Sequence, residues 1–190
     1  MTDWNQRYAD NDTPWDKGTA APPLEELFDE PASASWFKQG PILVPGCGTG
    51  HDVRLIARRT QAKVIGLDIA PLAIEQAQRH ARIGSENYQL ASWFDYQLPP
   101  QQKAAAIWEH TCFCAIHPSQ RPDYAKAVRR LLAPGGHFFG VFFLETGSDQ
   151  GPPWPSQLEE IKTLFSQDLE LIYEKAPERT YPGRENCEIL

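Results

Sequence analysis

Short apolar runs alternate along the chain with segments in which apolar residues recur at helical spacing. Such runs indicate buried strands, and the amphipathic segments between them indicate helices. The pattern predicts strands over residues 41–44, 63–68, 88–91, 104–108, 137–144 and 169–173, with a weaker signal over 186–190. It predicts helices over residues 24–28, 51–59, 71–82, 122–132 and 157–165, and an otherwise irregular stretch over residues 1–40.

The order of these elements predicts an α/β fold. The inner strands are apolar throughout and helices separate them, which is typical of a mostly parallel central sheet with helices on both faces. With 190 residues, the chain is expected to form one structural domain, 1–190. Within it, an aromatic-rich N-terminal arm or lid (1–40) precedes a Rossmann-like domain (41–190). Ligands of such sheets bind beyond the carboxyl ends of the strands, so the loops that follow those ends are the expected site.

Composition narrows the class of partner. The chain carries 18 basic and 25 acidic residues, a net charge of −7, which argues against binding nucleic acid through its phosphates. No apolar run is long enough to span a bilayer, and the N-terminus has no secretory pattern. The four cysteines show no disulfide or zinc spacing. We therefore expect a cytoplasmic protein, favoured as a monomer, with a small-molecule partner, no membrane contact and no metal.

Three glycines mark the first strand–helix junction. Gly46, Gly48 and Gly50 allow a sharp turn and a close approach of the backbone to a ligand, although a tight turn alone would also use them. Asp68 ends the next strand, where a carboxylate can accept the hydroxyls of a ribose or, alternatively, cap the following helix. The pair favours a nucleoside cofactor. A dinucleotide fingerprint would need a glycine where His51 stands, and a P-loop lysine is missing.

The glycine loop resembles motif I of class I S-adenosylmethionine-dependent methyltransferases. Longer strings are similar to the thiopurine S-methyltransferase superfamily, and among its members to the plant halide/thiol methyltransferases. These strings cover residues 13–18, 43–53, 64–69, 107–118 and 151–154. The resemblance implies S-adenosyl-L-methionine as cofactor, with S-adenosyl-L-homocysteine as its product. It departs from the family at Glu109-His110, which replaces an Asp-Tyr or Asp-Arg pair, and it is faint beyond Pro155.

The resemblance also implies which residues form the site. N-terminal aromatic residues would close over the cofactor, although they could equally latch the arm onto the domain, and the segment after the third strand would contact adenine. The implied cofactor-binding residues are Trp4, Tyr8, Trp15, Gly46, Gly48, Gly50, Asp68, Ser92, Trp93 and His110. The apolar candidates for the acceptor site are Trp15, Phe113 and Trp154, with Ile116 as a further wall residue. Core or loop packing is the competing interpretation of these acceptor-site candidates.

The expected reaction is an in-line methyl transfer to a small soft nucleophile: a thiol, thiopurine, halide or reduced selenium or tellurium species. Because the cofactor is already activated, the protein supplies position and desolvation, and no catalytic residue is assigned. An oxygen- or nitrogen-directed methyltransferase would need a base, for which Glu109 and His110 are the nearby candidates. A cofactor-binding protein without catalysis is another alternative, and a nicotinamide oxidoreductase is disfavoured by His51.

Overall fold

The computed structural model describes residues 2–37, 40–148 and 150–190. Within these residues, the strands are β1 (Ile42–Pro45), β2 (Lys63–Asp68), β3 (Ser85–Leu90), β4 (Ala104–His110), β5 (Leu132–Phe143) and β6 (Glu188–Ile189). The helices are α1 (Trp4–Ala9), α2 (Pro22–Asp29), α3 (Ser33–Trp36), α4 (His51–Thr60), α5 (Pro71–Arg79), α6 (Arg121–Leu131) and α7 (Leu158–Phe165), with a 3₁₀ turn over Pro118–Gln120. The predicted α/β class is confirmed.

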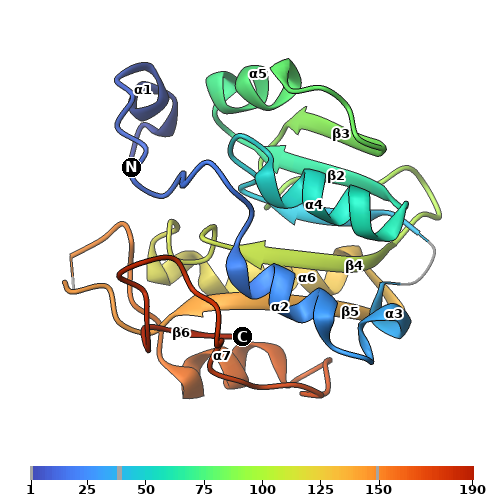
Figure 1. Ribbon diagram of the computed structural model, residues 1–190. Helices are drawn as coiled ribbons and strands as arrows, with labels where there is room; N and C mark the ends of the chain where they lie inside the picture. Colours follow the sequence, from blue (N-terminus) through green and yellow to red (C-terminus); the bar gives the residue numbers. More distant parts are fainter. Residues whose placement is uncertain (1, 38–39, 149) are drawn as a thin grey trace.

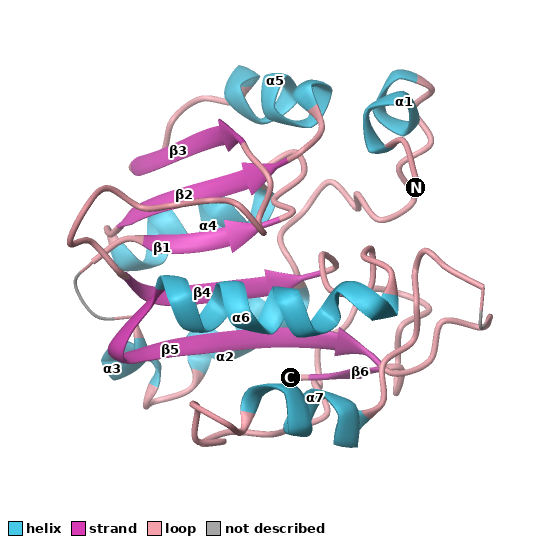
Figure 2. Cartoon of the chain, turned by 180° about the vertical axis from the view of Figure 1, so that it is seen from behind, coloured by secondary structure: helices cyan, strands magenta, loops and turns pink. Residues whose placement is uncertain are grey.

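The strands form one sheet in the order β3-β2-β1-β4-β5-β6. Strands β1 to β5 are parallel, and β6 pairs antiparallel with the end of β5, where Phe142 lies opposite Ile189. The chain order reverses at β1, which lies between β2 and β4. In Figures 1 and 2 the arrowheads of β1 to β5 point toward the side where α1 and the long loops lie. That edge is where an open parallel sheet binds its ligand.

Helices cover both faces of the sheet. On one face α2, α3 and α4 enclose an apolar cluster that includes Leu24, Leu27, Ile42, Val53, Ile56, Val64, Trp108 and Val141. On the other face α6 and α7 cover a second cluster that includes Leu43, Ile65, Ile107, Phe113, Tyr124, Val128, Phe142, Ile161 and Phe165. Because β1, β2 and β4 contribute to both clusters, their sequences are apolar at nearly every position, as the parallel-sheet prediction requires.

The arm holds more structure than the sequence pattern indicates. Helix α1 begins at an N-cap, Asp3, whose carboxylate accepts a hydrogen bond from the Gln6 amide at 2.9 Å. Its buried Tyr8 packs against Ala70 and Ala73, next to the start of α5. The prediction of an irregular stretch outside 24–28 is therefore wrong for α1 and α3. Residues 1, 38 and 39 of the predicted arm lie outside the described residues, and the division at residue 40 stays a prediction.

The predicted strand over residues 169–173 is wrong. This segment has no strand geometry, and Leu171 and Ile172 are 62% and 56% exposed. The weaker signal over 186–190 marks the strand that does form, β6, which occupies the position beside β5. Just after this segment, Lys175 and Leu190 exchange two backbone hydrogen bonds, both of 2.9 Å. No helix among the described residues is long and apolar enough to cross a membrane.

Candidate active site

The glycine loop turns the chain from β1 into α4 through left-handed backbone conformations. Gly46, Gly48 and Gly50 have φ values of 58°, 53° and 81°, which side-chain-bearing residues rarely adopt. Space also excludes side chains here. A Cβ at Gly46 would lie 2.8 Å from Cβ of Cys112, and one at Gly50 would collide with the ring of Tyr88. All three predicted glycines are therefore required by the shape of this turn.

Asp68 joins the end of β2 to this loop. Its Oδ2 accepts the Gly48 amide at 2.9 Å, and its Oδ1 accepts the Ala70 amide at 2.9 Å, just before α5. Burial raises the pKa of Asp68, against the lowering effect of these hydrogen bonds. The structure thus combines both interpretations of Asp68. It organises the backbone at the start of α5, and it also faces the cavity described next.

A cavity of about 1020 Å³ opens beyond the carboxyl ends of the strands. Three groups of residues line it: the arm, the loops after β1, β2 and β3, and the segments that follow β4 and β5. The predicted residues it brings together are Trp4, Tyr8, Trp15, Gly46, Asp68, Ser92, Trp93, Ile116 and Trp154. Ligand sites typically enclose about 300–1000 Å³, so this cavity has room for a nucleoside cofactor and a second small molecule.

The predicted aromatic trio of the arm forms one cluster at this cavity. Trp15 lies edge-on to Trp4 and Tyr8, with ring centroids 5.3 and 5.9 Å apart, and its indole donates to the Tyr8 hydroxyl at 3.3 Å. The guanidinium of Arg7 stacks 4.5 Å from the Trp15 ring. The cluster presents aromatic surface to the cavity, which suits a cationic sulfur.

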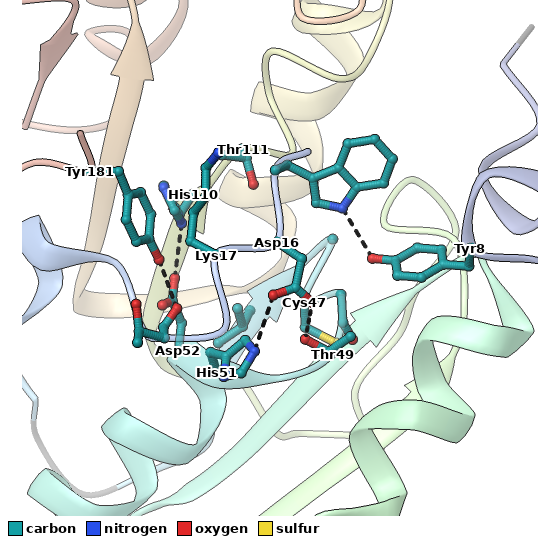
Figure 3. A pocket seen from close by; sticks show the side chains of 15 residues that line it. Tyr8, Asp16, Lys17, Cys47, Thr49, His51, Asp52, His110, Thr111 and Tyr181 are labelled. Atoms are coloured by element: carbon teal, nitrogen blue, oxygen red, sulfur yellow. Dashed lines mark hydrogen bonds and ion pairs between the residues drawn. The ribbon is translucent and has the colours of Figure 1, made fainter. Parts of the chain in front are cut away.

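A smaller pocket of about 50 Å³ lies beside the same glycine loop (Figure 3). Here Asp16 of the arm accepts hydrogen bonds from the Thr49 hydroxyl at 2.6 Å and the Gly18 amide at 2.8 Å, and His51 Nε2 lies 3.2 Å away. The hydrogen bond from His51, together with those from Thr49 and Gly18, lowers the pKa of Asp16 well below its usual range. The arm is therefore fastened to the glycine loop by a charged side chain.

His110 faces this smaller pocket and not the large cavity. Its Nδ1 lies 3.2 Å from Asp52 Oδ2, and its Nε2 lies 3.4 Å from a guanidinium nitrogen of Arg184. Asp52 also accepts the Trp108 indole at 2.8 Å and the Ala21 amide at 2.7 Å. His110 and Gly48 thus line the smaller pocket and not the large cavity, and Gly50 lines neither space.

Of the predicted acceptor-site residues, Phe113 does not line the cavity. Its ring is buried against Tyr124 and Phe142, edge-on at 5.4 and 5.3 Å. It therefore fills the core, as the competing interpretation of that residue holds. Trp154 and Ile116 do line the cavity, and so do Cys112 and Cys114, whose thiol pKa values are raised by burial.

Arg184 is a site residue that the sequence pattern did not indicate. It lies in the C-terminal segment, reaches the cavity wall, and stacks on Phe143 and Tyr181 at 4.6 and 5.3 Å from the ring centroids. Buried Glu188 holds one of its nitrogens at 3.1 Å. Its position in the sequence is 74 residues from His110, and it follows the last string that carried the family resemblance, so no local signal marks it.

Comparisons with known proteins agree with this architecture. A family model described as Thiopurine S-methyltransferase (TPMT) matches residues 1–181. "Thiocyanate methyltransferase 1" of Brassica oleracea is 35% identical over 157 residues, which cover 80% of this chain and 66% of that protein. "Probable thiol methyltransferase 2" of Arabidopsis thaliana is 31% identical over 172 residues, 89% of this chain and 74% of that protein. The chain thus spans about two thirds to three quarters of the length of these relatives.

The fold is shared with solved methyltransferases of lower identity. The Burkholderia thailandensis 1,6-didemethyltoxoflavin-N1-methyltransferase, solved with bound 1,6-didemethyltoxoflavin and S-adenosylhomocysteine, superimposes with a TM-score of 0.71. It is 15% identical, and the match covers 98% of this chain and 82% of that chain. At this identity the likeness shows the Rossmann-like fold. Together with the match to the family model, these findings show that the chain belongs to the thiopurine S-methyltransferase family of S-adenosylmethionine-dependent methyltransferases.

Proposed function

We propose that this chain transfers the methyl group of S-adenosylmethionine to a small soft nucleophile bound in the large cavity. The acceptor is a thiol, a thiopurine, a halide or a reduced selenium or tellurium species. The observation that carries the proposal is the convergence of the glycine loop, Asp68 and the aromatic arm on one cavity that also holds an arginine, Arg184. Thiocyanate and thiol acceptors in the names of the plant relatives support the same chemical class.

The lining residues fit the cofactor. Asp68 uses one lone pair of each oxygen for the loop amides, so a second lone pair of each remains for the ribose hydroxyls. Ser92 and Trp93 line the part that follows β3, where adenine would lie. The first part of the arm, with α1 and Trp15, would act as a lid, in which Trp4, Tyr8 and Trp15 cover the sulfonium and exclude water. When bound, the cofactor supplies an electrophilic methyl group on a positively charged sulfur.

The acceptor side of the cavity favours an anion that needs no base. Arg184 offers a positive charge, whereas Ile116 and Trp154 offer apolar surface that strips water from a polarisable nucleophile. Among the described residues that line the cavity, Asp68 is the one carboxylate, and both its oxygens hold backbone amides. His117 lies at the exposed rim.

The structure disfavours an oxygen or nitrogen acceptor. The two base candidates are Glu109, which is fully buried in the core, and His110, which faces the smaller pocket. Neither reaches the large cavity, so neither is placed to take a proton from a hydroxyl or amine there. A thiolate or halide needs no such group. The four cysteines are free, which suits the reducing cytoplasm that we propose as its location.

Two measurements test the proposal. Thermal unfolding with S-adenosylhomocysteine or NAD identifies the cofactor, since a ligand at a hundred times its Kd stabilises by about 2.7 kcal/mol. We expect stabilisation by S-adenosylhomocysteine, and stabilisation by NAD alone would contradict the proposal. Headspace detection of methyl iodide, methyl thiocyanate or methanethiol, with iodide, thiocyanate or hydrosulfide supplied, then tests transfer. If S-adenosylhomocysteine binds but no soft acceptor in the panel is methylated, the chain is a cofactor-binding protein without this activity.

A further inference from the structure

A loop of seven residues, 111–117, separates β4 from the 3₁₀ turn and forms a continuous part of the cavity wall. All its residues except Phe113 line the cavity. At one end Cys112 lies against the glycine loop, where its Cβ and Sγ would be 2.8 and 3.0 Å from a Cβ at Gly46. At its midpoint the carbonyl of Cys114 accepts the amide of Trp154 at 2.7 Å. The 111–117 loop thus sets the distance between the cofactor side and the acceptor side.

This loop is held from inside the core by one side chain. Oε1 of Glu109 accepts the amides of Cys112 at 2.9 Å and Phe113 at 2.7 Å, and Oε2 accepts the hydroxyl of Tyr124 on α6. The Glu109 side chain is fully buried and outside the cavity, so it cannot touch either substrate. Thr111 has a φ of 65°, a left-handed conformation that the loop keeps where it leaves β4.

We propose that Glu109 is a positioning residue for methyl transfer: its buried carboxylate holds the 111–117 loop in the shape that aligns the acceptor with the cofactor. This inference rests on the proposed function of the cavity. A carboxylate binds two amides more strongly than a neutral acid does, because the hydrogen bonds are charge-assisted. A small shift of this wall would misalign the nucleophile, the methyl carbon and the leaving sulfur, and alignment is the main contribution expected from the protein.

The surroundings of Glu109 make its hydrogen bonds with the loop amides dependent on pH. Burial raises its pKa to about 7, against the lowering effect of the Phe113 amide, Tyr124 and His110. The other titratable groups that face it are Cys112 and Cys114 in the loop, whose thiols stay neutral. Glu109 therefore gains a proton when the pH falls below about 7, and the hydrogen bonds that it accepts from the two amides weaken.

The chain offers a matched control in Glu86. It is also a buried glutamate whose carboxylate accepts two consecutive amides, those of Ile83 at 2.6 Å and Gly84 at 2.7 Å. That motif lies at the beginning of β3, at the opposite end of the sheet from the cavity. Glu86→Gln therefore repeats the chemical change of Glu109→Gln without touching the 111–117 loop.

The test compares these two variants with the wild type. Amide hydrogen exchange of residues 110–117, which needs no turnover, should speed up about tenfold in Glu109→Gln and stay unchanged in Glu86→Gln. With iodide as acceptor, which does not titrate, the kcat/KM for iodide should fall about fivefold at pH 8 in Glu109→Gln, because the nucleophile is misaligned. The Kd for S-adenosylhomocysteine should not change. In the wild type the kcat/KM for iodide should fall as the pH falls through 7, and in Glu109→Gln it should be independent of pH.

The outcomes separate the two proposals. If Glu109→Gln and Glu86→Gln give the same exchange rates over residues 110–117, Glu109 does not hold the loop and the inference is overturned. The inference is also overturned if exchange speeds up but the kcat/KM for iodide and its pH profile stay those of the wild type. If wild-type protein methylates no acceptor, the proposed function fails by itself, while the exchange experiment still reports whether Glu109 holds the loop.

Discussion

Asp16 accepts a hydrogen bond of 2.6 Å from the hydroxyl of Thr49, which joins the N-terminal arm to the glycine loop (Figure 3). The two residues are 33 positions apart in the sequence. Trp15, which lines the large cavity, is the neighbour of Asp16, so the contact fixes the aromatic cluster of the arm relative to the glycine loop. His51 adds a second contact from the same turn, with its Nε2 at 3.2 Å from the Asp16 carboxylate.

Asp16→Asn should therefore loosen the lid and weaken cofactor binding. The amide keeps one acceptor oxygen but loses the charge that His51 and Thr49 bind, a difference of about 1–2 kcal/mol, or a Kd for S-adenosylhomocysteine raised about 5- to 30-fold. Isothermal titration calorimetry measures this Kd for the variant and the wild type. Asp10→Asn, on the exposed surface of the arm, is the control and should leave the Kd unchanged. Equal Kd values for Asp16→Asn and the wild type would show that the contacts of Asp16 do not support cofactor binding by the arm.

Asp68→Ala should lower cofactor affinity. Two ribose hydroxyls lose a charged acceptor, which corresponds to about 1–3 kcal/mol and a Kd raised about 5- to 150-fold. The same substitution frees the amides of Gly48 and Ala70, so Tm should fall as well, and binding must be measured well below the Tm of the variant. Glu75→Ala, on the exposed surface of α5, controls for loss of a negative charge. An unchanged Kd with a lower Tm would leave Asp68 with its backbone role alone.

The part of the cavity that we propose for the cofactor could be predicted from the sequence because its residues are local. A strand, three glycines and a helix follow one another directly, and Asp68 ends the next strand of a parallel sheet, so the β2 and β1 ends must meet. The aromatic trio of the arm was implied by the family resemblance. The acceptor half is built by long-range contacts. Arg184 reaches the cavity only because β6 folds back beside β5, and no pattern near residue 184 reports that.

The predictions that were wrong also have physical reasons. Residues 169–173 have the composition of a strand, but β6 occupies the place beside β5, so the segment has no strand to pair with and leaves Leu171 exposed.

Phe113 and Ile116 are both apolar and lie in the same loop. Apolarity does not tell which of them faces the cavity, because a turn points successive side chains in different directions. The Glu109 hydrogen bonds to the Cys112 and Phe113 amides turn Phe113 into the core.

Arg184 should govern the affinity for anionic acceptors. Arg184→Met alone would leave Glu188 buried without its cation, so the double variant Arg184→Met/Glu188→Gln removes both charges and keeps the site neutral. Its KM for iodide or thiocyanate should rise about tenfold, the effect of losing one partly buried charge contact, with an unchanged Kd for S-adenosylhomocysteine. Arg184→Lys keeps the charge, so its KM for these acceptors should lie between those of the wild type and the double variant. Wild-type KM values in the double variant would exclude Arg184 from acceptor binding.

Glu109 should also make folding stability depend on pH, with a sign opposite to that of most carboxylates. Its pKa is raised from 4.5 to about 7, chiefly by burial, so the folded state holds the proton more tightly than the unfolded state between these values. The stability from that proton is fully present below pH 4.5 and is lost as the pH rises to about 7. Glu109→Gln carries no titrating group, so the unfolding free energy of the variant relative to wild type should increase between pH 5 and 8.

The expected increase is on the order of 3 kcal/mol, from the linkage of one pKa shift to stability, and urea unfolding at intervals of one pH unit measures it. Glu86 gives the opposite case. Burial acts to raise its pKa, but the amides of Ile83 and Gly84 lower it overall, so its stabilisation is lost only as the pH falls below about 4.5. Glu86→Gln should therefore differ from the wild type by a constant amount between pH 5 and 8. A constant difference for Glu109→Gln as well would mean that Glu109 titrates like an exposed glutamate, and that no proton near pH 7 loosens the 111–117 loop.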